Sequence, residues 1–243
     1  MTQLVQTPTF SPAGWSFSHE RRRGPKLPDS LGVLFDFDPA YSMTQDRKAG
    51  LSCVQGGTGA VTREVHNGRY CAVFNGANYL DFAGSLFDSL SDLTAQGGVS
   101  IEVVYEGSVN ASAVCLYNSE ASDTSDRILN YDDANEKAGI YVYNATPAFR
   151  AAFDDAGNTA LKAVGFHATT TQRTCSSGGT EHAAGTAGGI DPAGLNRLVI
   201  GAGASAGAPG AFPTTGRVYR VLVRAGGFSS AVDAVLSPYY LPA

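Results

Sequence analysis

The sequence predicts an all-β protein: an antiparallel β-sandwich of the jelly-roll type, with an extended N-terminal arm and one short C-terminal helix. Of its 243 residues, 29 are glycine and only 16% are charged, a composition typical of strands joined by turns. Short apolar runs alternate in the half-buried manner, as in residues 99–103 and 217–223. Clusters of Gly, Asn, Asp and Ser separate these runs, which favours two packed antiparallel sheets.

Residues 1–30 are predicted to form the arm, because four prolines prevent a helix or a central strand there. An extended segment has no core of its own in which to bury aromatic rings. We therefore expect the arm to dock on a partner surface, while a solvated tail with incidental aromatics remains the alternative. The expected docking residues are Phe10, Trp15, Phe17, Arg21, Arg22 and Arg23.

Residues 31–243 are predicted to form a single sandwich domain, because no stretch in this range resembles a linker between domains. The glycine-rich residues 201–210 are interpreted as a long loop, and residues 229–236 as the short helix, with Ser229 or Ser230 as its N-cap. The predicted strands are residues 31–38, 69–75, 79–82, 99–106, 113–117, 127–131, 139–143, 148–153, 161–168, 195–200 and 217–224.

Charge and hydropathy exclude two classes of partner. The net charge of −5 argues against nucleic acid, because binding to phosphates requires clustered cations. No run of about 18 apolar residues occurs, so no membrane span is expected, and the first residues lack the features of a signal peptide.

The four cysteines are widely scattered, which argues against a zinc site. We expect most of them to be small core residues, although a disulfide that forms later outside a cell remains open. They are Cys53, Cys71, Cys115 and Cys175.

An ordered set of segments between about residues 65 and 240 resembles a known family. The segments are residues 73–80, 99–104, 165–169, 195–201, 216–223 and 230–233. Their order is similar to the laminin-G-like branch of the concanavalin A-like lectin/glucanase superfamily. The sequence departs from that pattern at residues 176–178, where Ser-Ser-Gly replaces the usual Asn-Gly or Asp-Gly turn.

The resemblance implies a module like those of tailed-phage virion proteins. On this interpretation the chain is a non-enzymatic structural protein of the virion, assembled in the bacterial cytoplasm. Its arm would attach to other virion proteins of the capsid or tail, and it would form a homo-oligomer such as a trimer. The alternative is a carbohydrate-binding adhesin or tail-fibre protein that contacts host surface glycans.

Catalysis is not expected. Glucanases of the superfamily carry carboxylates along one strand, and Glu102 and Glu106 have the outer spacing of that pattern. They would lie about 13 Å apart along a strand, whereas glycosidase pairs need about 5 to 9.5 Å. Val104 occupies the middle position, so two solvated glutamates are the simpler interpretation. The four histidines have no recognisable nucleophile elbow near them.

Two weaker sites remain as hypotheses. Oxygen ligands gather at Asp132, Asp133 and Asn135, where calcium could bind although the order of a dedicated calcium loop is lacking. No other cofactor is expected. If the fold binds glycans, aromatic faces on loops are the expected platform, and the alternative is that these rings cover sheet surface. The candidates are Tyr117, Tyr131, Tyr141 and Tyr143.

Overall fold

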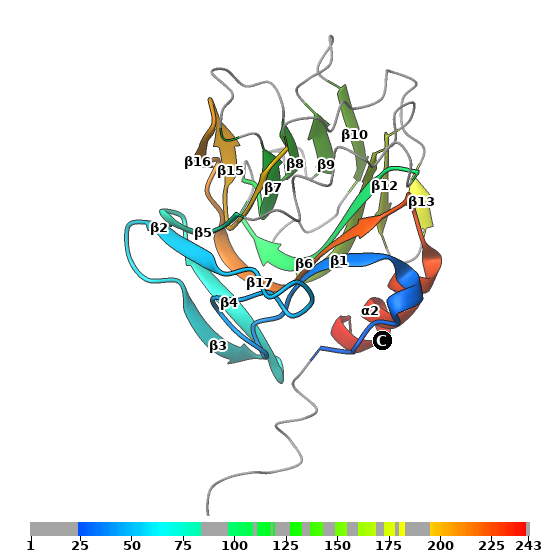
Figure 1. Ribbon diagram of the computed structural model, residues 1–243, viewed down its shortest axis with the longest axis horizontal. Helices are drawn as coiled ribbons and strands as arrows, with labels where there is room; N and C mark the ends of the chain where they lie inside the picture. Colours follow the sequence, from blue (N-terminus) through cyan, green and yellow to red (C-terminus); the bar gives the residue numbers. More distant parts are fainter. Residues whose placement is uncertain are drawn as a thin grey trace, which may run out of the picture.

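The computed structural model of the chain describes residues 24–83, 97–108, 111–117, 119, 127–132, 137–142, 149–154, 160–168, 173–177, 180–182 and 195–241. It confirms an all-β antiparallel sandwich of two large sheets with one short C-terminal helix (Figure 1). The expected docking residues of the arm lie outside the described residues.

The first sheet has eight strands, in the order β13-β12-β11-β6-β17-β4-β3, with β1 also paired to β17. The long central strand β17 pairs with β6 along one side, and its other side pairs first with β4 and then with β1. The strands are β1 (Val33–Phe37), β3 (Thr62–His66), β4 (Arg69–Asn75), β6 (Val99–Gly107), β11 (Lys162–Ala168), β12 (Arg173–Ser177), β13 (Thr180–His182) and β17 (Thr215–Ala225).

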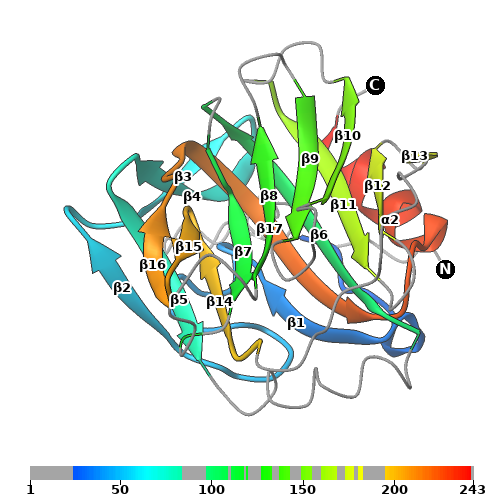
Figure 2. The ribbon, with the colours of Figure 1, turned by 90° about the horizontal axis from the view of Figure 1, so that it is seen from above.

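The second sheet has seven strands, in the order β10-β9-β8-β7-β14-β5-β2 (Figure 2). The strands are β2 (Cys53–Gly57), β5 (Asn78–Ala83), β7 (Val114–Tyr117), β8 (Arg127–Asp132), β9 (Lys137–Val142), β10 (Phe149–Asp154) and β14 (Arg197–Ile200). The two sheets enclose one main core, to which alternate residues contribute from β1, β4, β5, β6, β7, β11, β14 and β17. Phe35 and Phe37 of β1 pack edge-on against Phe82 of β5, with ring centroids 5.0 and 5.9 Å apart.

The outer face of the eight-stranded sheet carries a second apolar layer, covered by helix α2 (Ser230–Tyr240) and by residues 24–31 (Figure 1). Leu27, Val232 and Leu236 are buried there against β17, β6 and β4. The Gly24 amide donates a hydrogen bond to Asp38, and Arg220 donates one to the Pro25 carbonyl. Residues 24–30, which the sequence analysis assigned to the arm, therefore lie packed on the sandwich.

The expectation that the glycine-rich residues 201–210 form a long loop was wrong. The glycine-rich segment predicted as a loop contains the hairpin of β15 (Gly203–Ser205) and β16 (Ala208–Ala211). Its apolar positions are alanines, which bury little side-chain surface and so give no strong strand signal in the sequence. Ala202 and Ala204 pack on Val199 and Cys115 at the outer face of the seven-stranded sheet.

All four cysteines lie in described strands, and no disulfide joins any two of them. Cys71, Cys115 and Cys175 are buried, as expected for core residues, and burial raises the pKa of the Cys71 thiol to about 12. Among the described residues, no helix has the length and apolar character needed to cross a membrane.

Candidate binding pocket

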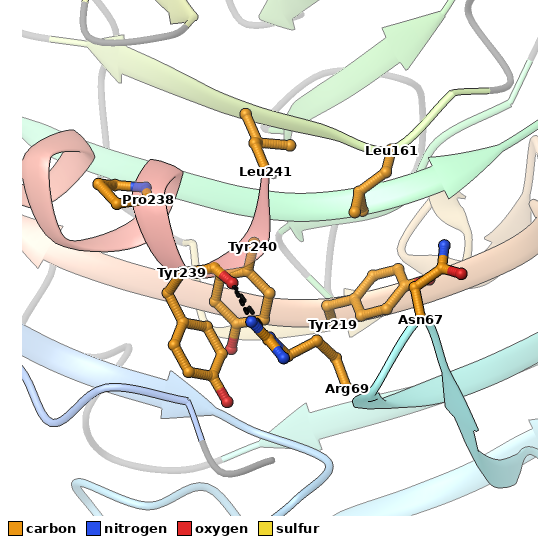
Figure 3. A pocket seen from close by; sticks show the side chains of 8 residues that line it. All are labelled: Asn67, Arg69, Leu161, Tyr219, Pro238, Tyr239, Tyr240 and Leu241. Carbon is orange, nitrogen blue, oxygen red and sulfur yellow. Dashed lines mark hydrogen bonds between the residues drawn. The ribbon is translucent and has the colours of Figure 1, made fainter. Parts of the chain in front are cut away.

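A pocket of about 460 Å³ opens on the outer face of the eight-stranded sheet, beside the C-terminal end of α2 (Figure 3). This volume is within the range of about 300 to 1,000 Å³ that is typical of small-ligand sites. We call it the tyrosine pocket. It is lined by Asn67, Arg69, Leu161, Tyr219, Pro238, Tyr239, Tyr240 and Leu241.

Asn67 reaches the pocket from a tight turn. It forms the two-residue connection between β3 and β4 with Gly68, and their φ angles are +49° and +75°. Positive φ at both positions is the signature of a type I′ hairpin, in which Asn-Gly is strongly preferred. The turn holds Asn67 at the rim and starts β4 at Arg69.

Arg69 joins β4 to the end of the helix. Its Nε–H and Nη2–H groups donate to the main-chain carbonyl of Tyr239 at 3.0 and 2.8 Å, and its guanidinium lies 4.3 Å from the centroid of the Tyr239 ring. The last carbonyls of a helix have no partner within the helix, and a cation there complements the helix dipole. Arg69 is therefore the C-terminal cap of α2.

Three tyrosines form the aromatic part of the wall. Tyr240 contacts Tyr239 and Tyr219 edge-on, with centroids 4.7 and 6.3 Å apart. Tyr219 is fully buried, and within the described part of the chain its hydroxyl has no hydrogen-bond partner. Burial raises the pKa of this hydroxyl, with the nearby Glu106 carboxylate acting in the same direction. The Tyr219 hydroxyl thus keeps its proton and can both donate and accept.

Charged side chains continue along the same face of the sheet. Arg217 of β17 binds the carboxylates of Glu64 and, at 2.6 Å, Glu106, and His66 lies 3.6 Å from Glu106. Glu102 is only 3% exposed and binds Arg224 at 2.6 Å. The expectation that Glu102 and Glu106 are two solvated glutamates was therefore wrong, because each binds its own arginine on the covered face of the sheet.

Tyr117 does not lie on a loop. It belongs to β7, is 1% exposed, and its hydroxyl donates to Asp81 at 3.0 Å, while Arg197 binds the other carboxylate oxygen at 2.6 Å. Its ring face is therefore closed to a sugar, which corrects its assignment as a glycan platform. It fits the alternative that these rings cover sheet surface.

The structure describes only some of the other residues that were predicted to bind glycan or calcium. Tyr131 belongs to β8 and Tyr141 to β9, and both strands are described by their backbone only. Asp132 is the last residue of β8, which pairs with β9. Tyr143, Asp133 and Asn135 lie outside the described residues. Among the side chains that are described, no group of three or more potential metal ligands occurs.

None of the eight residues that line the tyrosine pocket was predicted from the sequence as a site residue. One signal was present, since an Asn-Gly pair between two alternating segments predicts a hairpin. That pair would have located Asn67 in a turn directly before Arg69. Nothing in the local sequence brings these residues to Tyr239, because the contact spans 170 residues of chain.

No model of a protein family matches this sequence, and no curated protein matches it either. Solved structures do match. Domain 4 of a GH43 extracellular arabinanase from Geobacillus stearothermophilus, in complex with arabinotriose, gives a TM-score of 0.65 at 11% identity, over 86% of this chain and 98% of that chain.

Toxin binding domains also share the fold. The binding domain of botulinum neurotoxin serotype C1 gives a TM-score of 0.61 at 7% identity, and that of botulinum neurotoxin DC, in complex with rat synaptotagmin II, gives 0.59 at 7%. This chain covers 52% of each of them, so it spans about half their length. At such identities the likeness defines the fold alone. That fold is a β-sandwich of two antiparallel sheets.

Proposed function

We propose that this chain is a non-enzymatic, lectin-like module that binds a glycan, and that the sugar enters the tyrosine pocket. The observation that carries the proposal is the composition of the pocket wall, where tyrosine rings lie beside an amide and a guanidinium. The arabinanase domain of the same fold, in complex with arabinotriose, supports a sugar as the ligand.

Such a wall suits a sugar for two reasons. The C–H faces of a sugar ring pack on aromatic rings, while its hydroxyls need hydrogen-bond partners at defined positions. Asn67 and Arg69 offer those partners from the hairpin of β3 and β4. The pocket volume of about 460 Å³ also leaves room for a sugar residue.

Binding on a broad glycan array, followed by calorimetry of the strongest ligand, tests the proposal. Asn67→Gly removes the amide and retains the turn, because glycine adopts the required positive φ. We expect this variant and Tyr239→Ala each to weaken binding by about tenfold, the loss of roughly 1.4 kcal/mol. Tyr41→Ala, which removes a 55% exposed tyrosine outside the pocket, is the matched control.

The control variant should bind as the unchanged protein does. Absence of binding on the array would overturn the glycan proposal, and equal binding by all three variants would overturn the tyrosine pocket as its site. Thermal unfolding of each variant separates a local loss of contacts from a loss of the fold.

A second candidate is a structural protein of a phage virion, held to the capsid or tail by the arm. The aromatic and basic composition of residues 10–23 favours it. Because residues 24–30 pack on the sandwich, deletion of residues 1–23 is the appropriate variant. In phage production this variant should be absent from purified particles although it is folded, and normal incorporation would contradict the docking role.

A further inference from the structure

We propose that the tyrosine pocket selects a sugar residue that carries a carboxylate, and that Arg69 is the group that recognises it. This inference rests on the proposed glycan-binding function and adds the chemical class of the ligand. It follows from a difference between Arg69 and the other arginines on the same face of the sheet.

On the outer face of the eight-stranded sheet, the described arginines of β17 all hold carboxylates. Arg217 binds two glutamates, Arg220 binds Asp36 through two hydrogen bonds of 2.6 and 2.8 Å, and Arg224 binds Glu102. Arg69 makes its contacts with the carbonyls of Gly68 and Tyr239 and with the Tyr239 ring. Carbonyls and rings orient a guanidinium without compensating its charge, and no carboxylate among the described residues forms an ion pair with Arg69.

The guanidinium retains donors for a ligand. It carries five N–H groups, and the cap of α2 uses one on Nε and one on Nη2. The bond from Nη1 to the Gly68 carbonyl is long, at 3.4 Å. The remaining N–H groups belong to a side chain that lines the pocket, in which Figure 3 shows the guanidinium beside the Tyr239 ring.

A second donor lies in the same wall. The side-chain amide of Asn67 lines the pocket from the turn that precedes Arg69. Figure 3 shows Asn67 on the opposite side of the pocket from Tyr239. The amide can bind a hydroxyl of the same sugar residue whose carboxylate binds Arg69.

The residues around Arg69 favour a ligand carboxylate over a neutral ligand hydroxyl. Leu161, Pro238 and Leu241 form an apolar part of the wall, where a charge-assisted hydrogen bond is stronger than in water. Glu64 and Glu106 lie on the same face, but both bind Arg217 and neither lines the pocket. The ligand carboxylate is therefore expected to point toward Arg69 and away from these two glutamates.

The test compares acidic sugars with their neutral forms. Oligomers of galacturonate, glucuronate and mannuronate are measured by calorimetry beside the same oligomers after reduction of their carboxylates to alcohols. We expect at least one acidic oligomer to bind at least tenfold more tightly than its reduced form. Raising the salt concentration should weaken the acidic ligand and leave the reduced one unchanged.

Two substitutions separate the charge of Arg69 from its role as a helix cap. Arg69→Lys and Arg69→Gln can both donate to the Tyr239 carbonyl, but only lysine retains the charge. We expect Arg69→Gln to abolish the preference for the acidic oligomer and Arg69→Lys to retain most of it. Arg63→Gln, at a surface arginine that lies over Tyr70 of the neighbouring strand, is the matched control and should keep the full preference.

The possible failures are distinguishable. Binding of neutral and acidic forms with equal affinity, lost in Asn67→Gly, would overturn the acidic ligand and leave the glycan proposal intact. Absence of binding by any oligosaccharide, acidic or neutral, would overturn both. An acid preference that survives in Arg69→Gln would overturn the role of Arg69, provided that thermal unfolding shows this variant to be folded.

Discussion

Buried polar side chains on the covered face of the eight-stranded sheet make specific contacts, and His167 of β11 is an example. It is 3% exposed, and its two ring nitrogens lie 2.9 and 3.0 Å from the hydroxyls of Ser100 and Ser176. Burial lowers its pKa to about 3, and the Arg224 guanidinium acts in the same direction. A neutral imidazole has one donor and one acceptor nitrogen, which suits two hydroxyl partners.

The lowered pKa of His167 predicts a loss of stability in mild acid. An unfolded histidine has a pKa of about 6.5, so the unfolded chain binds a proton that the folded chain excludes. The contribution of His167 to stability is fully present above pH 6.5 and falls at lower pH by up to about 1.4 kcal/mol per pH unit. Denaturant unfolding between pH 7 and pH 5 measures this slope.

Substitution of the same histidine checks this prediction. His167→Gln, which can still bond to both hydroxyls, should flatten the slope between pH 6.5 and 5. An equal slope in the unchanged protein and in His167→Gln would contradict the assignment.

At the scale of single elements, two turns with positive φ have different surroundings. Gly68 ends the type I′ turn at φ +75°, and a Cβ there would meet no atom within 4 Å. Gly57 ends β2 at φ +79°, and a Cβ there would overlap the main-chain carbonyl of Ala77. The same carbonyl accepts a hydrogen bond from the Thr58 amide at 2.8 Å, so it cannot move without losing that bond.

Alanine at these two glycines should therefore have unequal costs. Gly68→Ala adds only the strain of a left-handed conformation, about 1 to 2 kcal/mol. Gly57→Ala adds the displacement of a backbone carbonyl to that strain and should cost clearly more, with loss of the pairing of β2 on β5. Unfolding free energies of the two variants, compared under one condition, check the order, and equal values would contradict it.

At the scale of the whole molecule, β17 connects the sandwich to the segments that cover its eight-stranded sheet, which are residues 24–31 and helix α2. Asp36 of β1 binds Arg220 of β17, and Asp38 holds both the Gly24 amide and, at 2.7 Å, Arg47. Burial raises the pKa of Asp36, whereas Arg220 acts against that rise. These contacts bring the start of the described chain to the same sheet face as the end of α2.

Two N-terminal truncations can show at which residue the packed part of the chain begins. Deletion of residues 1–23 retains every contact described above and serves as the reference. Deletion of residues 1–30 removes Leu27, which is 6% exposed, and the hydrogen bonds of Gly24 and Pro25. It should lower the melting temperature by several degrees, since one buried leucine alone contributes about 2 kcal/mol. Equal melting temperatures for the two truncations would contradict this boundary.

Much of the fold could be predicted because strand formation is local. The alternation in residues 99–103 locates β6 and assigns the residues of one face to the core, without knowledge of any neighbour. The segment predicted at residues 69–75 coincides with β4. The hairpin of β15 and β16 was missed, because alanine and glycine carry little of that pattern.

The sequence by itself determined the fold class, the positions of most strands and the C-terminal helix, since these depend on the spacing of apolar side chains along a few residues. The tertiary structure alone decided which strands are neighbours, which carboxylate each arginine holds, and where a pocket opens. Arg69 and Tyr239 are 170 residues apart in the chain and meet because α2 folds back over β4. A contact of that kind follows from the packing of the whole molecule, so no local pattern could reveal it.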